Sequence, residues 1–155
     1  SFNIGNGQRG AGTVTLGTTN SITATTLLLG GNTTTGGSTS TLNLGQTNTI
    51  NATTITSGSG RSSGNINFAS GLTSATVTIC GVAGGSTTAP LNVGIAGSVS
   101  ASGVGQGVVD FTGGGTGSVD ALFGTVNLGQ SATALAAAVP PELLSLDSAR
   151  SMPLR

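Results

Sequence analysis

Two stretches of this chain, residues 14–30 and 42–58, have nearly the same sequence. They align without a gap at an offset of 28 residues, and nine of the seventeen aligned positions are identical. The identical pairs include Leu16 with Leu44 and Ile22 with Ile50. Short β-type runs and Gly turns that recur at a fixed period of this length are typical of a solenoid, in which each repeat stacks on the next. The sequence therefore predicts an all-β fold, a parallel β-helix with coils of about 28 residues.

The apolar residues of the short runs are spaced by two, so the members of each pair lie on one face of a strand. Examples are Val14 with Leu16, Ile66 with Phe68, and Val126 with Leu128. We expect these residues to point inward and Thr, Ser and Asn to point outward. Residues related by 28 positions should stack one strand spacing apart, and Asn20 should form an amide ladder with Asn48.

The period becomes irregular after residue 60, so loops of varying length are expected in the later coils. The segments Leu91-Asn92-Val93-Gly94 and Val126-Asn127-Leu128-Gly129 repeat the pattern of Leu42-Asn43-Leu44-Gly45, although Val93 lies off the 28-residue grid. The composition changes near residue 138, where Gly and Thr disappear. We therefore predict a β-solenoid over residues 1–138 and, over residues 139–155, a C-terminal cap or a tail that connects subunits.

The charge content is very low, with four basic and four acidic residues among 155 and no His. So few cations cannot neutralise a phosphate backbone, which argues against nucleic acid as a partner. No apolar run reaches the ~20 residues that a membrane-spanning helix requires. A net charge near zero gives little protection against association, so the chain should associate with itself or with something large.

Candidate catalytic and metal-binding residues are few. Asp110 and Asp120 are the acids that precede the tail, and both should face outward on different faces. Glycoside hydrolysis requires two carboxyl groups within roughly 5–10 Å of each other. Without His, and with Cys80 as the one cysteine, zinc ligation and Ser-His catalysis lack the necessary groups. We predict no enzymatic activity, no metal and no cofactor, and a structural role for Cys80.

The residues also resemble a known family. The segments Leu42–Ala52, Gly64–Phe68, Val77–Gly85, Val109–Gly114 and Val119–Leu122 look like the repeat units of large bacterial autotransporter-like surface proteins. The resemblance spans roughly residues 12–130. It implies a β-helical, exported, non-enzymatic protein located outside the cell or at the cell surface.

The leading functional prediction is a structural extracellular subunit that assembles with itself, head to tail, into a fibre or surface layer. The ends should carry this function, because terminal strands without a cap pair edge to edge. The predicted self-assembly residues are the apolar side chains of the first rung and of the tail: Phe2, Ile4, Val139, Leu143, Leu144 and Leu146.

The sequence is also compatible with two alternative functions. One is an adhesin-like passenger module that binds a surface, with cell-surface or matrix glycans as its partner. The other is an ice- or carbohydrate-binding solenoid, suggested by Thr-x-Thr pairs such as Thr13 with Thr15 and Thr23 with Thr25. At an offset of 28 these pairs align with Thr41 and Asn43, and with Asn51 and Thr53, so the ranks of Thr are broken. The β-propensity of Thr on exposed strand faces also accounts for the pairs.

Overall fold

The computed structural model describes residues 1–6, 10–32, 37–95 and 105–129, and most of these residues form strands. One 3-10 turn, η1 (Thr112–Gly114), interrupts them. The strands are β1 (Phe2–Asn6), β2 (Thr13–Thr15), β3 (Thr19–Asn32), β4 (Thr39–Leu44), β5 (Thr47–Gly60), β6 (Ser63–Phe68), β7 (Thr76–Cys80), β8 (Ala89–Ile95), β9 (Gly107–Asp110), β10 (Ser118–Ala121) and β11 (Phe123–Leu128). All pairings between these strands are parallel.

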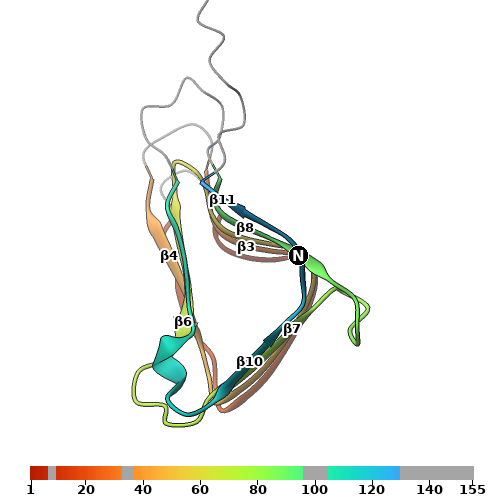
Figure 1. Cartoon of the computed structure of the whole chain (residues 1–155). Coiled ribbons are helices and arrows are strands. Elements are labelled where there is room, and N and C mark those ends of the chain that lie inside the picture. Colours follow the sequence, from red (N-terminus) through yellow and green to blue (C-terminus); the bar gives the residue numbers. More distant parts are fainter. Residues whose placement is uncertain (7–9, 33–36, 96–104, 130–155) are drawn as a thin grey trace, which may run out of the picture.

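The ribbon follows a three-sided outline when it is viewed along the direction in which the strands stack (Figure 1). Side 1 is the sheet β2-β4-β6-β9. The other sheet bends around a corner, because β3 and β5 are long enough to contribute to two sides. Side 2 contains the first halves of β3 and β5 with β7 and β10, and side 3 contains β1, the second halves of β3 and β5, β8 and β11.

The predicted register is confirmed over the first two circuits. Ile22 pairs with Ile50 and Asn20 with Asn48, at the offset of 28. On side 1, Thr15 pairs with Asn43, and the backbone N–H of Leu16 donates to Asn43 O at 2.9 Å. Leu16 therefore continues the same register beside Leu44.

Later circuits depart from this period, as the sequence predicted. The separation between stacked residues is 24 from Asn43 to Asn67, 36 from Thr56 to Asn92, and 35 from Asn92 to Asn127. One sequence interpretation needs correction here. Leu91 and Val126 lie on side 3, where Leu91 pairs with Ile55, whereas Leu42 lies on side 1. The pattern of an apolar residue, Asn, an apolar residue and Gly describes a strand that ends at a corner, and it fits more than one side.

Aliphatic side chains fill the space inside the three sides. Leu27, Leu29, Leu42 and Leu44 are completely buried, and Ile50 is 1% exposed. Stacking places these side chains in columns, such as Leu27 with Ile55 and Leu91. The apolar core therefore runs the length of the stack instead of forming one central cluster.

Within the described ranges, the expectation that all Ser and Asn residues point outward was wrong at four positions. Asn48, Ser40, Ser57 and Ser62 are buried polar residues. Asn48 shows why a polar side chain belongs inside: its Nδ2 donates to Gly45 O at 2.8 Å and to Thr76 O at 3.0 Å, while its Oδ1 accepts from Gly45 N at 2.9 Å. The amide satisfies backbone groups that a corner cannot pair, and leaving such groups unpaired would be costly.

The predicted amide ladder is present at this corner. Asn20 Nδ2 donates to Asn48 Oδ1 at 3.0 Å and to Gly17 O at 2.8 Å. Both Asn residues therefore play the same part in successive circuits, three residues after a Gly. In the next two circuits the position is taken by Val77 and Val119.

Candidate functional site

The C-terminal rung exposes side chains that its register directs inward. Val119 stacks on Val77, Val126 on Leu91, and Leu128 on Val93. Their exposed fractions are 49%, 50% and 69%, although Val77 and Leu91 one rung below are 1% and 6% exposed. The contrast arises because the inner residues are covered by a further rung, whereas β10 and β11 are the last described strands of their sides.

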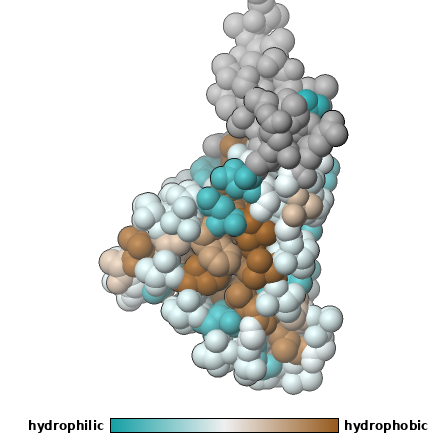
Figure 2. All heavy atoms as spheres, turned by 180° about the vertical axis from the view of Figure 1, so that it is seen from behind, coloured by the Kyte–Doolittle hydropathy of each residue, from teal (hydrophilic) through white to brown (hydrophobic). Residues whose placement is uncertain are grey.

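The N-terminal rung also presents apolar side chains. Figure 2 looks onto this end, which is the distant one in Figure 1, and apolar residues gather in the middle of the outline with paler residues around them. Phe2, Val14 and Leu16 are partly buried against the core. Ile4, a predicted assembly residue, is 4% exposed, and a Cβ added at Gly12 would come within 2.9 Å of its Cγ2. Ile4 is thus already covered within its own chain.

The N-terminal end is stepped, because its outermost strand covers one side only. On side 3, β1 pairs with the second half of β3. On sides 1 and 2, β2 and the first half of β3 are the outermost of the described strands. Side 3 therefore has one strand more than each of the other two sides.

The remaining predicted assembly residues, Val139, Leu143, Leu144 and Leu146, lie outside the described residues. The structure therefore tests neither their role nor the predicted boundary at residue 138. All of the strands described here lie before residue 130.

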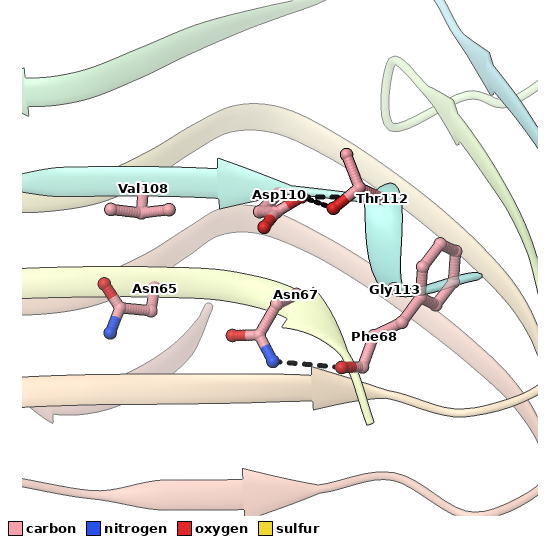
Figure 3. A pocket seen from close by; sticks show the side chains of 7 residues that line it. All are labelled: Asn65, Asn67, Phe68, Val108, Asp110, Thr112 and Gly113. Carbon is pink, nitrogen blue, oxygen red and sulfur yellow. Dashed lines mark hydrogen bonds between the residues drawn. The ribbon is translucent and has the colours of Figure 1, made fainter. Parts of the chain in front are cut away.

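A shallow notch of about 330 Å³ marks the outer surface of side 1 at its C-terminal edge (Figure 3). Asn65 and Asn67 from β6 and Val108 and Asp110 from β9 line it, and the 3-10 turn closes one end at Thr112. Asp110 Oδ1 accepts two hydrogen bonds from Thr112, at 2.7 Å from the hydroxyl and at 2.8 Å from the backbone N–H. These two bonds, the hydroxyl first, lower the pKa of Asp110, so the notch holds a fixed carboxylate.

Several polar atoms of the notch have no partner within the described part of the chain. Asn67 Nδ2 donates to Asn43 Oδ1 at 2.7 Å and to Phe68 O at 3.1 Å, which leaves its Oδ1 available. The amide of Asn65 and the second oxygen of Asp110 are likewise available. These groups can form hydrogen bonds with hydroxyl groups, beside the exposed methyl groups of Val108.

The two carboxylates before the tail lie apart, as the sequence predicted. Asp110 is on β9 of side 1, and Asp120 is on β10 of side 2. The described residues contain no group of three or more His, Cys, Asp or Glu side chains that could hold a metal ion.

The stacked Thr residues of side 2 were missed by the sequence analysis. Thr47 pairs with Thr76 and Thr49 with Thr78, and their outward side chains form two columns of hydroxyl groups. The first and last rungs continue these columns with Thr19, Ser21, Ser118 and Asp120. The offset from Thr47 to Thr76 is not 28, so a search at the fixed period cannot find this array. Of the Thr-x-Thr pairs seen in the sequence, Thr76 with Thr78 belongs to these columns. Thr13 with Thr15 does not stack in this way, because Thr13 and Thr41 are followed by Asn65 and Val108.

Cys80 is buried and free, as expected for a structural residue. Its thiol donates to Gly85 O at 3.2 Å. The loop 81–88, which projects at the corner between sides 2 and 3 in Figure 1, supplies this acceptor.

None of the helices in the described residues is long and apolar enough to cross a membrane. No protein-family model, no curated protein and no solved structure matches the sequence.

Proposed function

We propose that the chain is a three-sided parallel β-solenoid that acts as a structural subunit and assembles head to tail with copies of itself. The proposal is supported by the parallel strands, the 28-residue register of the first circuits, and the three-sided outline in Figure 1. The observation that carries it is the exposure of inward-facing side chains at the terminal rung, namely Val119, Val126 and Leu128.

The ends fit one another on side 3. In the columns of this side, Phe2, Leu27, Ile55, Leu91 and Val126 follow one another. If β1 of a second copy pairs with β11, its Phe2 stacks on Val126 and its Ile4 stacks on Leu128. The contact is heterologous and does not close on itself, so it propagates as a filament.

The free energy of this contact alone is modest. Covering the exposed parts of Val126 and Leu128 contributes about 2–4 kcal/mol, since burying a whole Val or Leu side chain is worth roughly 1.5–3 kcal/mol. Ile4 adds little, because it is already buried. Association costs at least ~4 kcal/mol in lost freedom of movement, so a lasting junction needs contacts beyond side 3.

Electron microscopy and light scattering of the purified chain test the proposal. We expect filaments, and a concentration threshold above which scattering rises. Deletion of residues 139–155, which removes none of the described strands, should leave the circular dichroism spectrum of the fold and abolish ordered filaments. A chain that stays monomeric at all accessible concentrations would refute self-assembly.

The proposed location is the cell surface or the extracellular space. The support is the resemblance of residues 12–130 to exported repeat proteins and the near absence of charge. Fractionation of the cells that naturally produce the protein, followed by detection with an antibody to this chain, would locate it, and recovery from the cytosol alone would contradict this part of the proposal.

A glycan-binding module is the second candidate, because the notch holds unpartnered amide and carboxylate oxygens next to an apolar residue. Hydroxyl groups of a sugar would pair with Asn65, Asn67 and Asp110, and its C–H face would contact Val108. Retention on immobilised polysaccharides that is lost in Asn65→Ala but kept in Asn92→Ala, a matched amide on side 3, would support it. Equal retention of both variants would count against the notch.

The Thr columns of side 2 favour ice as an alternative ligand for this surface. Thermal hysteresis of the purified chain measures ice binding directly, and Thr49→Lys would place a charged side chain within the array. We expect activity to disappear in this variant if side 2 binds ice. A wild-type chain without thermal hysteresis removes the alternative.

A further inference from the structure

The unequal number of strands on the three sides places a condition on any head-to-tail stack. In a stack of identical copies, the strands pair continuously across each junction on all three sides only if each copy contributes the same number of strands to every side. The described part of this chain contributes one strand more to side 3, because β1 precedes β2 on that side alone. When β1 of one copy pairs with β11 of another, sides 1 and 2 are each left with a gap of one strand, ~4.8 Å wide.

The order of the chain points to what fills the gap. In every described circuit the chain passes from side 3 to side 1, then to side 2, and back to side 3. The chain leaves β11 on side 3, so the next two sides it would reach are the two that lack a strand. The third side of that rung is then occupied by β1 of the neighbouring copy.

We propose that residues 130–155 of one copy supply the missing strands on sides 1 and 2, so that each junction rung is built from two chains. This inference rests on the proposed head-to-tail assembly. It names the tail as the partner of β2 and of the first half of β3 in the next copy. It also supplies the contacts that side 3 alone does not provide.

The length of the segment agrees with this role. One described circuit uses residues 33–53 to pass from the end of side 3 through sides 1 and 2, and residues 130–155 form a longer stretch. Pro140 and Pro141 interrupt the segment before the apolar residues around Leu143. Pro cannot donate to a β-ladder, so a Pro pair is suited to the corner between two sides.

The backbone groups that would receive the tail are identifiable. On side 1, Leu16 N donates to Asn43 O and Gly12 O accepts from Thr41 N, so the N–H groups of Thr13 and Thr15 point to the open edge. On side 2, Thr18 O accepts from Thr47 N, so the N–H of Ser21 points to the open edge as well. Substitution by Pro at these positions removes a donor from the open edge and leaves the internal ladder of the chain intact.

The test uses the full chain with Thr15→Pro or Ser21→Pro, and Val82→Pro as the control. Val82 lies in the exposed turn closed by the hydrogen bond from Gly84 N to Gly81 O, away from both ends, and Pro suits this turn position. We expect Thr15→Pro and Ser21→Pro to raise the threshold concentration for filaments at least tenfold, and Val82→Pro to leave it unchanged. Filaments that form at the wild-type threshold in both edge variants would overturn the inference and leave head-to-tail assembly in place.

A cross-linking experiment tests the same rung without a change to backbone donors. Copies that carry Thr15→Cys are mixed with copies that carry one Cys at each of positions 134–146 in turn, and the filaments are oxidised. Neighbouring strands bring paired Cα atoms within the ~4.4–6.8 Å that a disulfide requires. We expect cross-links at alternate positions of the tail, because successive side chains of a strand point to opposite faces. Filaments that form without any of these cross-links would show that another segment fills the gap, and would overturn the inference. If the wild-type chain forms no filaments, the proposed head-to-tail assembly, on which the inference rests, is itself refuted.

Discussion

Substitution of Asn48 by Val separates the hydrogen bonds of a buried amide from the packing around it. The site accepts Val sterically, because Val77 occupies the same inward column in the next circuit and is 1% exposed. The substitution removes the acceptor of Gly45 N and the donor to Gly45 O, both buried, and the donor to Thr76 O. Each buried group left without a partner costs ~1–3 kcal/mol, and added apolar burial returns about 1 kcal/mol. We expect a loss of about 3 kcal/mol in the free energy of unfolding.

Asn20→Val is the matched control for this experiment. Asn20 occupies the same position one circuit earlier, but it is only partly buried, and its side-chain amide donates to Gly17 O and to Asn48 Oδ1. We expect a cost of about 1 kcal/mol, since water can replace part of what is lost. Urea titration followed by circular dichroism is the suitable assay, because the chain has neither Trp nor Tyr. The protein concentration should lie below the onset of scattering, and an unchanged slope with urea shows that the transitions are comparable.

Two results would refute this reasoning. One is an Asn48→Val variant within about 0.5 kcal/mol of wild type, which would show that water or a shift of the corner satisfies Gly45 at little cost. The other is an equal loss in Asn20→Val, which would show that burial of the amide does not set its contribution.

Three further outcomes are expected. Gly45→Ala should destabilise the fold by several kcal/mol, because the new Cβ would collide with the carbonyl oxygen of Gly17, whereas Gly17→Ala, which meets nothing within 4 Å, should change the urea midpoint little. Cys80, at 5% exposed, should react with a thiol reagent slowly in buffer and rapidly in urea, and fast labelling of the folded chain would contradict its burial. The pKa of Asp110 is lowered in the folded chain, so its contribution to stability is present above the unfolded pKa of ~3.9 and disappears as the pH falls through the lowered value. The melting temperature of wild type should therefore fall more than that of Asp110→Asn between pH 5 and pH 2, and parallel curves would contradict the role of Thr112.

The first two circuits could be predicted from the sequence because they repeat without a gap. A constant offset of 28 gives the stacking partner of every residue in the repeat. One pair, such as Ile22 with Ile50, therefore determines the register of β3 and β5 on both sides to which they contribute. The inward direction of Asn48 was missed because a polar side chain was assigned to the outside. The signal for it was nevertheless present, since Gly17 precedes Asn20 and Gly45 precedes Asn48 by the same three residues. An Asn at this distance from a Gly turn is placed to bond the backbone of that turn.

The notch and the later pairings could not be derived in the same way. Asp110 and Asn67 meet because β9 pairs with β6, and the intervening chain has no fixed length that a period would reveal. The side 2 columns depend on the pairing of Thr47 with Thr76, which also lies off the 28-residue grid. A repeat search finds residues that stack at a constant interval, whereas these contacts depend on which side a strand belongs to.

The irregular circuits show that the strands determine how the circuits stack, whereas the corners between strands can vary in length. The strands of a side are held by ladder hydrogen bonds and by inward columns, and both require only that the right residues lie one strand spacing apart. The corners carry no such requirement, so the chain accommodates the loop 81–88 and the turn η1 between strands that remain in register. The same freedom applies to a rung made from two chains, because the ladder depends on the position of each strand and not on the covalent connection between strands. A missing strand at an end is therefore a site with a defined direction, register and side, and a segment that supplies it gains ladder hydrogen bonds with the strands on either side of it.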